Sequence, residues 1–339
     1  MAEEMMPGVY RIVAPLPGSP LKNINSYLIK GSIGGRHLLV DNAFNHPESL
    51  AALLAGLDEA GARPEDLDLF ITHCHADHLG LTKALSRGPA TKVYGSAIDA
   101  FFINEVASAC NPAETAKGLD GIWGGIYLPM QRHGFSRSEL ELVRQRHPAA
   151  LFGPGRQIDF TTLEDGDILE YGAYRLRVLH MPGHSPGLLT LYAEEQRLYF
   201  SADHILGDIT PNISFWSSMP DPLGTYLASL DRAARLDIRL SLPAHRREIT
   251  DTAARIEYLK QHHAERLEEV LAVLTDGPLN ARQTASRMTW SGRAKTWDEF
   301  PPSQKWFAVG EAFTHLCYLA MQGRARETDE GGNVVFSRL

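Results

Sequence analysis

A run of histidines directly after an apolar segment constrains this chain more than any other feature of its sequence. Residues 67–72 read Leu-Asp-Leu-Phe-Ile-Thr, which predicts a short strand, and residues 73–78 read His-Cys-His-Ala-Asp-His. Three imidazoles and one carboxylate within six residues are hard to explain by packing, and they are ligand types that zinc prefers. If the backbone stays extended, the side chains of His73 and His75 point to the same side. The run therefore predicts a metal site at the end of a strand.

The turn that follows supplies two more candidate ligands. Asp77 and His78 would face a second ion from that turn. Cys74 lies between two candidate ligands, but its alternate direction along the chain favours a packed, inert thiol. With Cys110 and Cys317 it makes three cysteines, too few and too scattered for a disulfide framework, so we expect reduced thiols.

The pattern His-x-His-x-Asp-His at residues 73–78 resembles the metal motif of the metallo-β-lactamase superfamily. Three further segments resemble the remaining ligand motifs of that family, in the family's order. They are Pro-Gly-His-Ser-Pro-Gly around His184, Tyr-Phe-Ser-Ala-Asp ending at Asp203, and Leu-Pro-Ala-His ending at His245. Ala244 replaces the glycine that the family commonly has there, a departure that should leave the ligand in place. The resemblance covers about residues 8–250.

The resemblance implies both a fold and a ligand set. The fold is α+β, an αββα sandwich of two β-sheets with helices outside, and its site lies at one edge of the sheets. The cofactors would be two divalent metal ions, with zinc favoured, although iron and manganese accept the same ligands. One ion would be held by His73, His75 and His184, the other by Asp77, His78 and His245, with Asp203 between the two.

Such a two-ion site would make a nucleophile from water. Two dications that share one water lower its pKa from 15.7 toward about 7, so a metal-bridging hydroxide is available at neutral pH. Asp77 and Asp203 are the predicted catalytic residues, because Asp203 bridges the ions and Asp77 can orient the hydroxide or carry its proton. Asp203 is not the cysteine of one major group of true β-lactamases, and His75 is not the carboxylate of the flavodiiron oxidoreductases. The resemblance thus implies hydrolysis of an ester-like bond, and we favour an acyl thioester.

The chain divides into two parts by its patterns. Residues 1–250 would form the catalytic domain, with a helical insertion or lid over residues 98–150. Residues 251–339 begin with a long amphipathic helix and continue with two shorter helices and a hairpin, an order that resembles a winged-helix module. The insertion and the helical tail could build a partly apolar acyl pocket. Strands are expected over residues 9–13, 26–29, 37–41, 67–72, 157–160, 168–170, 174–179, 188–192, 198–200 and 238–242. Helices are expected over residues 47–57, after residue 222, and over residues 251–275, 281–288 and 304–321. The hairpin is expected over residues 325–336.

Charge argues against nucleic acid as a partner. The net charge is −8, and residues 281–339 carry eight basic and six acidic side chains, whereas phosphate contacts need Lys and Arg. We expect a small-molecule acyl substrate, no nucleic acid and no membrane, because no apolar run approaches the ~18 residues of a spanning helix. A homodimer is an open alternative to a monomer. An acidic N-terminus interrupted by Pro7 disfavours a secretory signal, so we expect a cytoplasmic protein.

Three other functions are left open. A lactonase acting on acyl-homoserine lactones would share these seven ligands, and some lactamase-like endoribonucleases carry a similar helical tail. A regulatory module that binds DNA or a protein through residues 251–339 is the alternative that is not an enzyme. The intact ligand set counts against it, because such a module has little chemical reason to keep every ligand.

Residues near the motifs are candidates for substrate contacts. Arg246 and Arg247 directly follow His245 and could meet an anionic group, although a solvated pair is favoured. Four aromatic residues lie in segments that could overhang the site, with core packing as an equal alternative. They are Trp123, Tyr127, Phe215 and Trp216.

Other histidines have a structural interpretation. His180 is expected in the core or at the surface, and the side chain of His204 is expected to point away from the site. His262 and His263 would be solvated on the polar part of a charged helix, and His315 has no ligand-like neighbours in the sequence.

Overall fold

The described residues, 1–88, 90–290 and 296–339 of this computed structural model, form two β-sheets covered by helices. The seven-stranded sheet has the order β1 (Ala2–Met6), β2 (Val9–Pro15), β3 (Asn23–Ile29), β4 (His37–Val40), β5 (Leu67–Phe70), β6 (Val93–Gly95) and β7 (Thr161–Thr162). The five-stranded sheet has the order β12 (Leu240–Pro243), β11 (Leu198–Ala202), β10 (Leu189–Ala193), β9 (Tyr174–His180) and β8 (Ile168–Tyr171).

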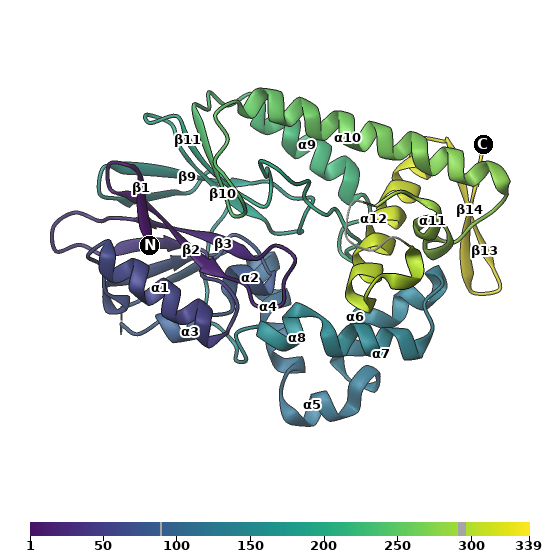
Figure 1. Cartoon of the computed structure of the whole chain (residues 1–339), viewed down its shortest axis with the longest axis horizontal. Coiled ribbons are helices and arrows are strands. Elements are labelled where there is room, and N and C mark those ends of the chain that lie inside the picture. Colours follow the sequence, from purple (N-terminus) through teal and green to yellow (C-terminus); the bar gives the residue numbers. More distant parts are fainter. Residues whose placement is uncertain (89, 291–295) are drawn as a thin grey trace.

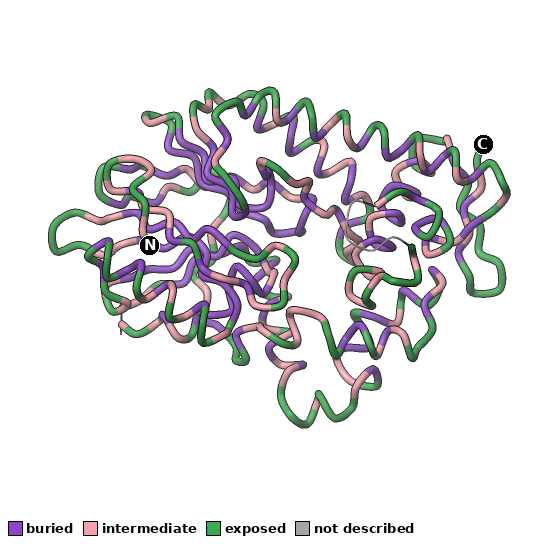
Figure 2. The backbone as a smooth tube through the Cα atoms, in the orientation of Figure 1, coloured by how far each residue is buried: buried purple, intermediate pink, exposed green. Residues whose placement is uncertain are grey.

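The two sheets pack face to face. Val178 and Phe200 of the second sheet share one buried apolar cluster with Phe70 of the first, and the ring of Tyr27 meets Phe200 edge-on at 5.7 Å. Because successive side chains of a strand point to opposite faces, Leu179 belongs to a different cluster on the outer face. Figure 2 shows the buried backbone concentrated in these sheets. The predicted α+β sandwich is confirmed.

Helices cover the outer faces of both sheets (Figure 1). Helix α1 (Pro47–Glu59) packs on the first sheet so closely that a Cβ at Gly56 would lie 2.4 Å from Cγ2 of Ile12. Helices α9 (Pro222–Ala233) and α10 (Thr252–Val273) pack on the second sheet, where Leu230 and Ile256 join the cluster of Leu179. The short helices α2 (Ala76–Leu79) and α3 (Thr82–Leu85) follow β5.

The stretch expected as a helical insertion is helical. Its elements are α4 (Ala97–Ala109), α5 (Pro112–Lys117), α6 (Ile122–Tyr127), α7 (Arg137–Arg146) and α8 (Pro148–Phe152). The strand predicted at residues 157–160 is wrong, because the chain reaches the sheet only at β7. The side chain of Asn104 on α4 bonds both the N–H and the carbonyl of Ile158, at 2.8 and 3.0 Å, in place of a neighbouring strand.

The C-terminal part contains α11 (Ala281–Arg287), α12 (Pro302–Met321) and a hairpin of β13 (Ala325–Glu330) and β14 (Asn333–Arg338), the order that the sequence predicts. One apolar cluster joins it to the outer face of the second sheet. Leu267 of α10 and Leu316 of α12 belong to the same cluster as Tyr199 of β11. The domain boundary at residue 250 stays a prediction, and buried contacts cross it.

The prediction of a solvated His263 is wrong. Its side chain is buried, with Nδ1 3.2 Å from Nε2 of His315, and its ring meets Tyr226 edge-on. His315, which the sequence leaves without a relevant neighbour, therefore has one on α10. Sequence periodicity places His263 on a helix face but does not reveal that α9 and α12 cover that face.

Membrane-spanning helices and disulfide bonds were both unexpected from the sequence. Among the described residues, no helix is long and apolar enough to cross a membrane. The three cysteines all lie in the described part and are unpaired, as expected.

Leu316→Ala tests whether the two parts share one core. Leu316 is fully buried, so the truncation should lower the free energy of unfolding by about 2–5 kcal/mol and shift a single transition, measured by denaturant and heat. Met321→Ala on the same helix is the control, because that side chain is 57% exposed. A separate early transition, with the remainder of the protein unfolding as in the native chain, would contradict a shared core.

Candidate metal centre

Several strands end at one edge of the sandwich, and the predicted ligands follow those ends. β11 and β12 run parallel, and β9 has the direction of β11 because both are antiparallel to β10. His73 follows β5, His184 follows β9, Asp203 directly follows β11, and His245 follows β12. Strands of one direction end at the same edge of a sheet, so residues far apart in the sequence meet there.

The predicted ligand atoms meet in adjoining groups. In the first, Nε2 of His73 lies 2.9 Å and Nε2 of His184 lies 3.0 Å from Nδ1 of His75. In the second, Nε2 of His245 lies 3.4 Å from Oδ2 of Asp77, and Nε2 of His78 lies 3.9 Å from its Oδ1. The structure therefore brings together the same sets that the family resemblance implies.

Asp203 lies between the two groups. Its Oδ2 is 3.4 Å from Nε2 of His184 and 3.6 Å from Nε2 of His78, while its Oδ1 is 3.6 Å from Nε2 of His245. Ala202, directly before it, has a φ of 48°, a left-handed conformation that turns the chain out of β11 at this point. One carboxylate thus faces ligands of both groups.

The ring of His78 is held by a buried carboxylate. Oδ2 of Asp41 lies 2.7 Å from its Nδ1, and the same carboxylate accepts hydrogen bonds from N and Oγ1 of Thr72, both at 2.9 Å. Asp41 directly follows β4. A partner on one ring nitrogen fixes the tautomer and leaves the other nitrogen as a ligand.

Backbone carbonyls hold two other rings in the same way. Nδ1 of His184 donates to the carbonyl of Asn212 at 2.8 Å, and Nδ1 of His245 donates to that of Asn23 at 2.9 Å. Both rings therefore present Nε2 to the centre of the cluster.

Several buried atoms of the cluster have no hydrogen-bond partner. Within the described residues these include Nε2 of His78, Nε2 of His245 and Oδ1 of Asp203. Buried polar atoms are nearly always paired, and converging lone pairs repel one another unless a cation lies between them. The donor set fits divalent ions, whereas the seven ligand assignments, the number of ions and the preference for zinc stay predictions.

The pKa shifts of two candidate ligands, His75 and Asp77, leave both side chains in a form that can bind a cation. Burial lowers the pKa of His75 to about 3, and His184 adds to the effect. Burial by itself would raise the pKa of Asp77, but His78 and His245 outweigh it and lower the pKa to about 2. At neutral pH His75 is thus a neutral imidazole and Asp77 a carboxylate.

A buried residue that the sequence did not single out, Asp99, connects two of the ligand loops. Its carboxylate accepts hydrogen bonds from the backbone N–H of Cys74 at 3.0 Å, from Oγ of Ser185 at 2.8 Å and from the N–H of Gly187 at 2.9 Å. Cys74 lies between His73 and His75, and the other two donors follow His184 in the sequence. Burial raises the pKa of Asp99 to about 6.

The approach of these loops requires glycine. A Cβ at Gly187 would lie 2.1 Å from Oγ of Ser96, which caps α4, and 2.6 Å from Oδ1 of Asp99. The sequence marks Asp99 only as an acidic residue in the first turn of a helix that follows a serine cap. Nothing local indicates that its carboxylate turns toward the ligand loops.

Of the four aromatic candidates, Trp216 contacts the ligands. Its ring stacks on His75 with centroids 6.0 Å apart, its Nε1 donates to the carbonyl of His184 at 3.1 Å, and it meets Phe102 of α4 at 5.6 Å. Trp123 and Tyr127 are instead buried in the core.

Other candidates lie as the structural interpretation expects. Phe215 packs on Phe313 of α12. Arg246 and Arg247 are exposed, and Arg247 pairs with Asp208 at 2.8 Å. Cys74 packs against apolar neighbours, and burial raises the pKa of its thiol.

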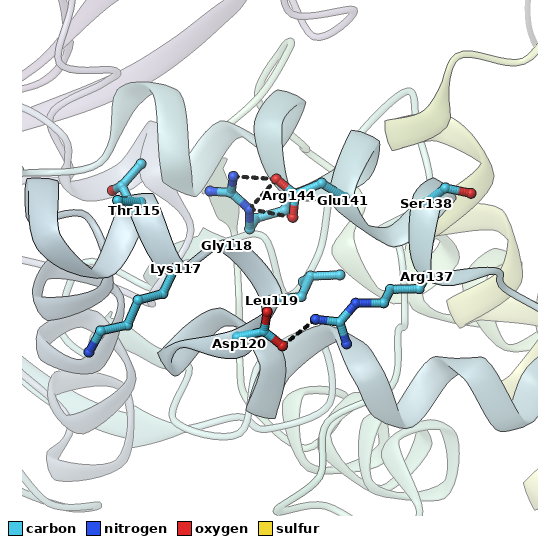
Figure 3. Close-up of a pocket in the computed structure, with 10 residues that line it drawn as sticks. Thr115, Lys117, Gly118, Leu119, Asp120, Arg137, Ser138, Glu141 and Arg144 are labelled. Carbon is cyan, nitrogen blue, oxygen red and sulfur yellow. Dashed lines mark hydrogen bonds and ion pairs between the residues drawn. The ribbon is translucent and has the colours of Figure 1, made fainter.

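A hollow of about 590 Å³ lies in the insertion and apart from the ligand cluster. Figure 3 shows the residues that line it, among them Arg137 and Arg144. Arg137 pairs with Asp120 and Arg144 with Glu141, so neither cation is left for an anionic ligand.

The chain belongs to the metallo-beta-lactamase superfamily, whose family model matches residues 20–245. The crystal structure of the metallo-beta-lactamase family protein TTHA1429 from Thermus thermophilus is similar over 99% of this chain and 100% of that one, with a TM-score of 0.77 and 29% identity. That likeness includes the C-terminal helical region. The resemblance drawn from the sequence is confirmed.

Curated relatives match to different extents. The lactamase-like protein adaB of Aspergillus niger is 32% identical over 124 residues, which span 37% of this chain and only 36% of that protein. The atrochrysone carboxyl ACP thioesterase of Emericella nidulans is 22% identical over 282 residues, 83% of this chain and 69% of that protein.

Metal removal tests the cluster directly. Chelation should lower the melting temperature and added Zn²⁺ should restore it, because ions that bind only the folded state at 1,000 times their Kd stabilise it by about 4.1 kcal/mol. Asp203→Ala should lose most of this response, measured by thermal melting and by metal content. Asp231→Ala, an exposed aspartate paired with Lys260, is the control. A response that Asp203→Ala retains in full would contradict the assignment of the bridging carboxylate.

Asp99→Asn tests the connection between the loops. The amide keeps the shape but turns an N–H₂ toward other donors, which should cost about 1–3 kcal/mol of stability and 10–100-fold in metal affinity. Both are measured by denaturant unfolding and by metal titration of the apo protein. Asp120→Asn makes the same change in an exposed ion pair and should have little effect. Native metal affinity in Asp99→Asn would show that the loops hold their positions without it.

Proposed function

We propose that this chain is a hydrolase with two divalent metal ions, zinc in the first instance, that cleaves an acyl thioester. The observation that carries the proposal is the position of Asp203, whose two oxygens face ligands of both groups. When bound, two such ions polarise a carbonyl group and lower the pKa of a shared water toward about 7. The side chains of the protein would hold the ions, orient the attacking water and contact the acyl group.

The ligands divide this work by position. His73, His75 and His184 would hold one ion, and Asp77, His78 and His245 the other. Asp77 is ionised, so it can accept a hydrogen bond from the attacking water and orient it. Its low pKa makes orientation a better role for Asp77 than storage of the released proton.

Aromatic side chains next to the ligands favour an apolar acyl group. Trp216 covers His75 on one side and contacts Phe102, and Phe102 in turn contacts Phe101 at 5.9 Å. Phe101 is 63% exposed, and Ile98 on the same helix is 43% exposed. These side chains provide apolar surface from the solvent to the ligand cluster, which suits an acyl chain or ring.

The relative from Emericella nidulans is named as a thioesterase that acts on an acyl group carried by a carrier protein. Its similarity spans most of both chains, and this supports the thioester as the bond to test first. The binding partner that we propose remains a small acyl compound.

The C-terminal hairpin favours this enzyme over a DNA-binding module. Its strand β13 reads Ala-Arg-Glu-Thr-Asp-Glu, with Glu327, Asp329 and Glu330 exposed. With Arg326 and Arg338 also exposed, the hairpin carries three acidic and two basic side chains, so it lacks the excess of Lys and Arg that phosphate contacts need.

Thiol release from a panel of coenzyme A and glutathione thioesters tests the proposal. The metal-loaded protein should hydrolyse at least one series, and Asp203→Ala should abolish turnover with the Asp231→Ala control unaffected. Trp216→Ala should raise KM for long or aromatic acyl groups more than for acetyl groups, since it removes apolar contact area. No release from any thioester, with the metal content confirmed, would reject thioester hydrolysis and favour acyl-homoserine lactones, then RNA, as substrates.

A further inference from the structure

One short segment, residues 212–216, holds the metal ligand His184 at two points. The ring is fixed by the carbonyl of Asn212, to which Nδ1 donates at 2.8 Å. The backbone is fixed by Trp216, whose Nε1 donates to the carbonyl of His184 at 3.1 Å. The direction of the His184 ring therefore depends on where this segment lies.

The segment is in turn attached to α12 of the C-terminal part. Nδ2 of Asn212 donates to Oε2 of Glu311 at 3.0 Å. The hydroxyl of Thr314 donates to the carbonyl of Ile213 at 2.9 Å. Two successive residues of the segment thus have hydrogen bonds to side chains of one helix.

Close packing reinforces these hydrogen bonds. A Cβ at Gly310 would lie 2.1 Å from Oγ of Ser214, so a larger residue would require this hydroxyl to move. One residue further along, the ring of Phe215 meets that of Phe313 at 5.3 Å. Contacts with α12 therefore follow residues 212–215 one after another.

Glu311 is the unusual member of this contact. Its side chain is 14% exposed, and its Oε1 lies 3.5 Å from Nε of Arg266, which α10 supplies and which is 9% exposed itself. Burying an ion pair costs desolvation free energy that the mutual attraction often fails to offset, so packing stability alone does not account for it. The position of Glu311 next to Asn212, whose carbonyl accepts a hydrogen bond from His184, offers an explanation for this ion pair.

We propose that Glu311 is a positioning residue for the metal centre: by accepting the hydrogen bond from Asn212, it fixes the carbonyl that orients His184. The C-terminal helix is then part of the ligand support of the first ion group, His73, His75 and His184. The second group has no such link through Glu311, because His78 and His245 are oriented by Asp41 and by the carbonyl of Asn23. This inference rests on the ligand cluster and is independent of the substrate.

Titration of the full-length apo protein with Co²⁺ tests this role, with the absorption spectrum of the bound ion as the readout. Glu311→Ala should weaken the binding of one ion about tenfold and change its spectrum, at the low end of the 10–100-fold loss known for outer partners of metal ligands. The affinity for the other ion should stay native. Glu311→Gln, which retains an acceptor oxygen for Asn212, should restore most of the affinity.

Matched variants separate positioning from general stability. Glu268→Ala on α10 removes a glutamate that is 66% exposed and paired with Arg324, and it should leave both affinities unchanged. Asn212→Ala keeps the carbonyl but loses the side-chain link, so it should reproduce Glu311→Ala, and the double variant should be no weaker than either single one.

Three outcomes would overturn the proposal. The first is native affinity for both ions in Glu311→Ala. The second is an equal loss for both ions, together with an equal loss in Glu311→Gln, which would make Glu311 a residue of general stability. The third is full additivity of Glu311→Ala and Asn212→Ala, which would show that the two side chains act separately.

Discussion

The meeting of seven ionisable side chains at one edge of the sandwich, six of them buried, is the constraint on which the rest of this structure depends. Imidazole and carboxylate atoms out of water are unfavourable unless each is paired, and among the described residues Nε2 of His78, Nε2 of His245 and Oδ1 of Asp203 have no hydrogen-bond partner. A cation bound at the centre of the cluster would remove this cost. The strand order, the tight glycines and the outer hydrogen bonds all serve to hold the ligands at distances where shared cations can satisfy them.

The family resemblance carried the prediction of this centre, and strand direction explains why the motifs meet. Each ligand motif follows an apolar segment, and buried strands of one direction must end at the same edge. The spacing within residues 73–78 places ligands on a short extended stretch and a helical turn, both local features. Which residues meet is what the family resemblance implies, and the structure brings together His184, Asp203 and His245, which follow three separate strands.

The features that the sequence did not predict depend on contacts between distant elements. Asp99 has the local pattern of an ordinary helix start, and only the approach of two ligand loops gives its carboxylate a second role. His263 has the neighbours of a solvated residue until α12 covers it. At residues 157–160 the apolar alternation is that of a strand, but Asn104 takes the backbone bonds that a ladder would need. In each case a tertiary partner overrides the local pattern.

The C-terminal part illustrates how support for a metal centre can extend beyond the fold that carries the ligands. The family model ends at residue 245, yet the segment that orients His184 is attached to Glu311 of α12, 66 residues later. An independent binding module would need only a small, polar interface with its neighbour. Here the interface contains a continuous apolar cluster and the close contact of Gly310 with Ser214. It also contains the largely buried ion pair of Arg266 and Glu311. Such an interface resists relative motion, and a rigid support is what a ligand needs when a displacement of a few tenths of an ångström changes metal affinity. The helices that follow residue 245 therefore form part of the support for the segment that contacts His184.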